Sequence, residues 1–154
     1  LVDAAMATQV TSDRPILVER SMYWAAYPNW YEAHNAFGVT GTSLKWVLGE
    51  GRVGGARGYE TYVLLANPGT TAATVTVTYL REGGQPPIVT THTVQPTSRY
   101  NVVPSVDGLS DERFGVLIES TQPMAVERAL YSNSPAQPGL FWAAGTGATG
   151  APLP

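Results

Sequence analysis

The sequence contains no cysteine, which excludes disulfides, thiolate nucleophiles, iron–sulfur clusters and cysteine-ligated zinc. Charged residues make up only 14% of the chain, against roughly 25% in a typical globular protein. Lys45 is the one lysine among nine basic residues, and no run of like charge occurs. Because a nucleic-acid groove and a polybasic membrane patch both need clustered basic residues, we expect neither.

Long apolar runs and an initiator methionine are also missing. No run approaches the roughly 18 residues that a membrane helix needs, and no signal peptide begins the chain, so we expect no membrane insertion. The first residue is Leu1. We therefore expect a processed or excised product, which is compatible with a secreted or cell-surface location.

Strand signals are frequent, whereas helix signals are weak. Thr alternates with Val across 73–80, which predicts a strand with one wet and one dry face. A strand at 59–66 is expected to stop at the turn signal Asn67-Pro68-Gly69. Further strands are predicted at 88–94, 98–103, 114–119 and 124–131, the last two separated by a break at 122–123. Short strands with turns at such spacing predict an antiparallel, immunoglobulin-like β-sandwich.

An internal repeat is the most informative feature of the sequence. Residues 6–24 align without gaps onto 114–132, and the identities cluster in the pattern Pro-x-x-Val-Glu-Arg-x-x-Tyr. We therefore divide the chain into an N-terminal half-repeat (1–50) with an aromatic insertion and a complete repeat (59–154). A hairpin alone is marginally stable, so the half-repeat is expected to pack on the complete one, on a neighbouring domain or on another copy of the chain.

Four sequence blocks carry a resemblance to a known family. They are Val18-Glu19-Arg20-Ser21-Met22-Tyr23-Trp24, Glu32-Ala33-His34-Asn35, Trp46-Val47-Leu48-Gly49-Glu50-Gly51 and Thr61-Tyr62-Val63-Leu64-Leu65-Ala66-Asn67-Pro68. The chain resembles a β-sandwich repeat of unknown function found at the C-termini of large secreted or surface bacterial proteins. The resemblance implies export and a structural or adhesive role, and it supplies no catalytic residues.

The repeated Glu-Arg pairs admit two interpretations. Glu19 and Glu127 are the candidate catalytic carboxylates of a glycosidase-like site. Alternatively, Arg20 and Arg128 are strand residues whose charge is balanced by a nearby carboxylate, since an unpaired buried charge is costly. A pair that recurs once per repeat favours the structural interpretation.

Histidines and glycines add little chemistry. His34 lies near Glu32 within the aromatic insertion, but no third ligand is signalled, and His92 is expected to face solvent in a strand. The letters of a dinucleotide fingerprint occur at Gly49-x-Gly51-x-x-Gly54 without the strand–helix context that the motif requires. We interpret that stretch as a flexible connection, and we predict no metal and no cofactor.

Aromatic residues concentrate in the insertion of the half-repeat. The candidates for an interface or for sugar stacking are Trp24, Tyr27, Trp30, Tyr31 and Trp46. Three interpretations stay open: a lid over the core, a protein interface, in which Trp and Tyr are enriched, and a glycan-binding platform.

The sequence thus predicts a non-enzymatic structural or adhesive module. We expect a subunit or segment of a bacterial surface assembly, with self-association or neighbouring domains as partners and a head-to-tail filament as one form. The rival hypothesis is a carbohydrate-binding module that uses surface Trp and Tyr. Nucleic acid is not an expected partner.

Overall fold

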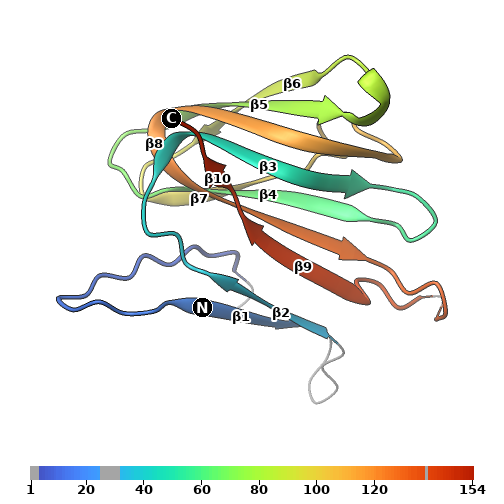
Figure 1. Ribbon diagram of the computed structural model, residues 1–154, viewed down its shortest axis with the longest axis horizontal. Coiled ribbons are helices and arrows are strands. Elements are labelled where there is room, and N and C mark those ends of the chain that lie inside the picture. The colour runs from blue at the N-terminus through green and yellow to red at the C-terminus, as the bar shows by residue number, and fades with distance from the viewer. Residues whose placement is uncertain (1–3, 25–31, 138) are drawn as a thin grey trace.

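The computed structural model describes residues 4–24, 32–137 and 139–154 and shows an antiparallel β-sandwich (Figure 1). The predicted all-β fold is confirmed. Within the described residues, the one helical element is the short 3-10 turn η1 (Glu82–Gly84), and no helix is long and apolar enough to cross a membrane.

The sandwich has two layers that share one long strand, β8 (Glu112–Ser132). In the first layer the order is β10-β3-β8-β5-β6, and in the second it is β7-β4-β8-β9. The bounds are β3 (Ser43–Val53), β4 (Glu60–Asn67), β5 (Ala73–Arg81), β6 (Ile88–Val94), β7 (Ser98–Val102), β9 (Ala144–Thr149) and β10 (Ala151–Pro152).

β8 corrects the predicted break at 122–123. Its first part pairs with β5 as far as Ser120, and its last part pairs with β4 from Ala125. Pro123 is exposed and lies where the strand passes from one layer to the other. Proline is tolerated there because its missing N–H removes no bond from either of these ladders. The two predicted strands are therefore one element that joins the layers.

β3 differs from the predicted flexible connection. Gly51 lies within this strand, where a Cβ atom would come within 2.3 Å of the Phe114 ring. The glycine thus admits an aromatic ring of the core, while Gly54 and Gly55 form the following turn with positive φ. Since β3 lies beside β8, the predicted boundary at residue 50 falls inside the sandwich.

The core lies between the two layers and contains residues from both. Alternation along β4, β5 and β8 directs every second side chain inward. Its fully buried members include Val63, Leu65, Val75, Val77, Tyr79, Val116, Ile118, Met124 and Val126.

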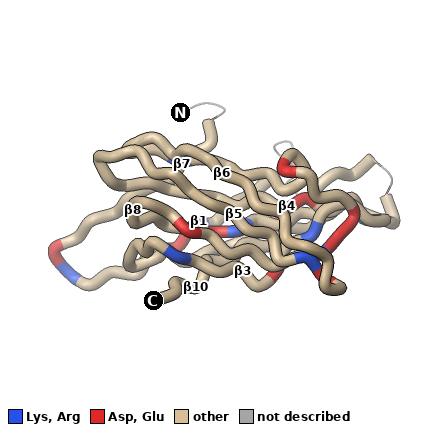
Figure 2. The backbone as a smooth tube through the Cα atoms, turned by 90° about the horizontal axis from the view of Figure 1, so that it is seen from above, with Lys and Arg blue, Asp and Glu red and all other residues tan. Residues whose placement is uncertain are grey.

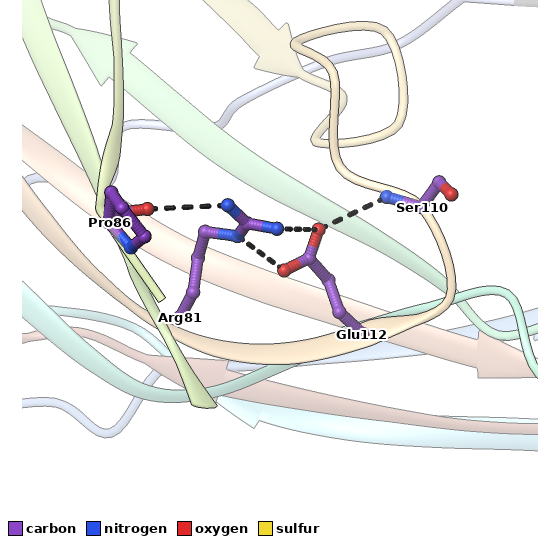
Figure 3. A network of polar contacts seen from close by, with 4 residues as sticks. All are labelled: Arg81, Pro86, Ser110 and Glu112. Carbon is purple, nitrogen blue, oxygen red and sulfur yellow. Dashed lines mark hydrogen bonds and ion pairs between the residues drawn. The ribbon is translucent and has the colours of Figure 1, made fainter. Parts of the chain in front are cut away.

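A polar network closes one end of the sandwich (Figure 3). Arg81 at the end of β5 donates from Nε to Glu112 Oε2 at 2.6 Å and from Nη1 to the carbonyl of Pro86 at 3.3 Å. The second carboxylate oxygen of Glu112 accepts from the amide of Ser110 at 3.3 Å. The network fixes the start of β8 against the end of β5.

The N-terminal part lies outside both layers. β1 (Glu19–Trp24) and β2 (Glu32–Phe37) form a separate two-stranded hairpin whose second strand packs against β9. Residues 4–18 belong to no strand, and in Figure 1 the blue segment before β1 runs beside the hairpin, outside the two sheets. The sandwich therefore begins at β3.

Candidate functional site

The hairpin docks on the outer face of the second layer, against β8 and β9. Arg20 Nη2 on β1 lies 3.2 Å from Glu127 Oε2 on β8, so the ion pair joins the two copies of the repeated motif. Arg128 points the other way, is 5% exposed, and lies with its Nη2 atom 3.4 Å from Glu50 Oε2 on β3. Each arginine is thus balanced by a carboxylate of another element, while Glu19 is exposed.

Charges of both signs lie beside one another along the chain (Figure 2). Glu127 contacts a cation, and the other candidate carboxylate, Glu19, sits on a different strand. The structural role of Glu19 and Glu127 therefore stays a hypothesis. The ion pairs of Arg20 and Arg128 favour a role in holding strands together.

Aromatic rings form the centre of the docking site. The Trp24 ring meets Tyr131 edge-on with centroids 5.4 Å apart, and Tyr131 stacks on Trp142 at 5.0 Å. Tyr62 on β4 contacts both Tyr131 and Trp142 in edge-on geometry. We call Trp24, His34, Tyr62, Tyr131 and Trp142 the aromatic cluster. Such edge-on and stacked pairs stabilise a contact beyond the area they bury.

Trp142 is held in an unusual backbone conformation. Its φ of 51° lies in the left-handed region, which is rare for a bulky residue. The amide of Trp142 donates to Asn133 Oδ1 at 3.0 Å, its indole Nε1 donates to Glu60 Oε2 at 3.1 Å, and its carbonyl accepts from Trp24 Nε1 at 2.6 Å. Three bonds thus hold a residue with a strained backbone at the joint between hairpin and sandwich.

Two glycines of β9 let the hairpin approach closely. A Cβ atom at Gly145 would come within 2.8 Å of the Trp24 ring, and one at Gly147 would come within 3.0 Å of His34 Nδ1. His34 is therefore buried, at 7% exposure, beside a bare backbone. Burial, aided by the Arg20 charge, lowers the pKa of His34 below its usual 6.5. The docked hairpin favours the neutral imidazole.

Burial also shifts the pKa of other groups around the docking site. Burial, followed by the bond to Glu60, raises the pKa of Tyr62 to about 12. Burial likewise raises the pKa of Tyr131 and lowers that of Arg128, the latter against the opposing charge of Glu50. Both tyrosines remain neutral phenols at physiological pH and act as packing groups.

Trp46 does not lie at the docking site, which corrects its assignment as an interface or glycan candidate. It is 3% exposed, and its indole nitrogen donates to the carbonyls of Ser43 and Met124 at 3.1 Å. It packs into the core because β3 is a strand of the sandwich. Tyr27, Trp30 and Tyr31 lie outside the described residues. Of the two candidates that the structure describes, Trp24 is the one that lies in the aromatic cluster.

Tyr62, Tyr131 and Trp142 were not predicted as site residues. Tyr131 had a signal in the sequence, because it is the counterpart of Tyr23 in the repeated motif. Tyr62 and Trp142 had none, since only the folded sheet brings β4 and the turn before β9 together.

His92 differs from the expectation that it faces solvent. Its side chain is 12% exposed, with Nε2 3.2 Å from Asp107 Oδ2. The same oxygen accepts from Tyr79 Oη at 2.6 Å and from Thr90 Oγ1 at 2.9 Å. This network anchors the loop after β7 on the first layer. Across 4–24, 32–137 and 139–154, no group of three or more His, Cys, Asp or Glu residues is placed to hold a metal ion.

An open groove of about 700 Å³ lies between the N-terminal segment and the end of the sandwich. Residues 5–10 form one wall, and the opposite wall includes Ala66–Pro68 and Thr97–Arg99. The segment therefore crosses the end of the second layer without filling the space beneath it.

Comparison with known proteins informs the fold. The chain matches no protein-family model and no curated protein. It is similar to the crystal structure of Thermotoga maritima 1070, with a TM-score of 0.63 and 14% identity over 73% of this chain and 96% of that one. It also aligns with the Anabaena sensory rhodopsin transducer at a TM-score of 0.47 and 22% identity, over 58% of this chain and 83% of that one. The first similarity supports the β-rich fold, and the second is too weak to inform it.

Proposed function

We propose that the chain is a structural module of an extracellular bacterial assembly, and that it acts by joining neighbouring β-sandwiches head to tail. The joined units are successive segments of one polypeptide or separate subunits of a filament. The resemblance to repeats of secreted bacterial proteins supports the location. No catalytic role is part of this proposal.

The observation that carries the proposal is the N-terminal half-repeat. It has the sequence pattern of β8, yet residues 4–18 lie outside both layers. The hairpin that follows buries one of its faces against the outer side of β8 and β9. A half-repeat that completes the sheet of a neighbouring sandwich makes a heterologous contact, and such contacts build open chains when the rotation does not close.

A carbohydrate-binding module remains the second candidate, and one observation favours it. Trp142 is 39% exposed while its ring stacks on Tyr131. A sugar ring binds to the open face of such an aromatic platform. The candidate stacking residue of this hypothesis is therefore Trp142, since Trp24 is engaged with Tyr131 and the Trp142 carbonyl.

Surface labelling tests the location and the role together. An antibody against the folded sandwich should label intact cells that produce the chain. On glycan arrays, we expect no glycan binding that depends on Trp142, so Trp142→Ala should leave the array result unchanged. Labelling only after cell lysis would contradict the proposal. Glycan binding that is lost on Trp142→Ala, with the sandwich still folded, would favour the second candidate. Sedimentation velocity over a range of concentrations then separates subunits of a filament from segments of one polypeptide.

A further inference from the structure

Residues 4–18 have the sequence of a core strand but the surroundings of a surface segment. Met6, Val10, Ile16 and Val18 are 53%, 49%, 56% and 37% exposed. Their aligned counterparts in β8 are Phe114, Ile118, Met124 and Val126, which are 4%, 0%, 0% and 0% exposed. The same pattern of apolar side chains is thus wholly buried in one copy and open in the other.

The hairpin repeats the geometry of the complete copy as well as its sequence. In β1–β2, Arg20 pairs with Ala36, and in β8–β9, Arg128 pairs with Ala148. Beyond each pair, the amide of Gly38 donates to the Val18 carbonyl at 3.0 Å, and the amide of Gly150 donates to the Val126 carbonyl at 2.9 Å. β1 is therefore the counterpart of the last part of β8.

One edge of this counterpart lacks its sheet. β8 pairs with β9 on one side and with β4 on the other. β1 pairs with β2, and on its other side the described residues contribute no strand. A strand edge that no described strand covers, with an apolar face beside it, is a template for strand pairing.

We propose that residues 4–24 are the eighth strand of a second sandwich of the same kind, one that lacks a β8 of its own. This inference rests on the proposed function and names the partner: a polypeptide with the strands equivalent to β3–β7. An intact second copy of this chain does not fit, because its own β8 already lies between β3 and β5 and between β4 and β9.

The docked hairpin and the second sandwich use the same face of β1. Arg20, Met22 and Trp24 face this sandwich in the structure. Their aligned counterparts, Arg128, Leu130 and Ser132, are buried in the complete copy at 5%, 8% and 6% exposure. When β1 joins the second sandwich, the docking contacts of the hairpin are therefore lost. Arg20 then leaves Glu127 and pairs with the residue of the second sandwich that corresponds to Glu50.

A tandem protein tests the proposal with the full chain retained. Residues 39–111 are added ahead of residue 4, because residue 4 aligns with Glu112, where β8 begins. The added copy supplies β3–β7 and the original N-terminal segment supplies the missing strand. Amide exchange across 4–18 should slow by at least about 100-fold relative to the unextended chain, since central strands exchange only through larger openings.

A substitution in the segment provides the matched control. Ile16 is exposed in this chain, so Ile16→Asp should leave the midpoint of unfolding of the unextended chain unchanged. In the tandem, the same change places a carboxylate at the position of the buried Met124 and should abolish the added protection. A substitution that acts equally in both proteins contradicts the proposal.

Cross-linking checks the register independently of exchange. Leu64 pairs with Glu127, so Leu64→Cys in the added copy should form a disulfide with Glu19→Cys. The chain has no other cysteine, and the pair Leu64→Cys with Ser21→Cys, displaced by two residues, should not form one.

An added copy that stays unfolded while 4–18 stays unprotected overturns the inference. So does protection of 4–18 in the unextended chain that rises with concentration, which would make a second copy the partner. Neither result alters the surface-labelling test of the proposed function.

Discussion

Asn67 offers the sharpest test of how the sandwich is held together. It ends β4, is 1% exposed, and the two hydrogens of its Nδ2 are shared among the carbonyls of Thr71, Val94 and Gln95 at 2.8, 3.2 and 3.2 Å. Its Oδ1 accepts from the amide of Gly69 at 3.0 Å. One side chain thus links the end of β4, the loop before β5 and the end of β6. This explains structurally why the Ala-Asn-Pro block occupies that turn.

Asn67→Asp keeps the shape of the side chain and removes the donor. Three backbone carbonyls then lose a bond and face a buried carboxylate. Each lost bond costs about 1 kcal/mol, and an uncompensated buried charge costs about 3 to 5 kcal/mol. Because the introduced carboxyl group escapes part of that cost by taking up a proton, we expect a net loss of about 3 to 5 kcal/mol at neutral pH.

Urea unfolding followed by tryptophan fluorescence measures this loss. The matched control is Asn101→Asp on β7, which is exposed and lies beside Arg99, and we expect it to change the free energy of unfolding by less than about 0.5 kcal/mol. The cost at Asn67 should shrink at pH 4, where the introduced group is protonated and can donate. A loss below about 1 kcal/mol at pH 7, or a cost that grows on acidification, refutes the assigned bonding.

Three further predictions concern the docked hairpin. Because burial lowers the pKa of His34, the undocked state takes up the proton first, so docking should weaken as the pH falls below about 6.5. The urea midpoint for unfolding of the hairpin should drop on acidification, and His34→Asn should flatten that pH dependence. Gly147→Val should displace the hairpin, at a cost of about 1 to 3 kcal/mol, and expose it to limited proteolysis, whereas Gly41→Ala, with open space around it, should not. Glu127→Gln should lower the free energy of unfolding by at most about 1 kcal/mol, because its ion pair with Arg20 is partly exposed; a larger loss in thermal unfolding contradicts the surface character of that pair.

Strands with clear alternation were predictable from the sequence. The prediction at 88–94 coincides with β6, and that at 73–80 differs from β5 by one residue. The signal was strong because Thr and Val alternate across 73–80 and turns bound both segments. The strand predictions were wrong where a proline or glycine is required by the tertiary packing. Pro123 does not break β8 because it lies at the passage between layers, and Gly51 belongs to a strand because Phe114 needs the space.

The candidate site was predictable only in part. Strand alternation correctly indicated that one member of the Glu127-Arg128 pair points inward, since Arg128 is buried while Glu127 lies on the opposite face. The partners were not predictable, because Glu50 comes from a strand that the sequence suggested was a loop. The aromatic cluster was not predicted because its members are far apart in the sequence. Tyr62, Tyr131 and Trp142 come together only once β4, β8 and β9 are aligned.

Amide exchange of the chain by itself tests the central claim most directly, because two aligned segments of one molecule are compared in one sample. The account predicts slow exchange across 114–126, where β8 is central. It predicts exchange at nearly unprotected rates across 6–18, which belong to no strand, with a difference of about 1000-fold or more that does not depend on concentration. Comparable protection of the two segments at low concentration would contradict the claim that the N-terminal copy is a core strand without its sandwich.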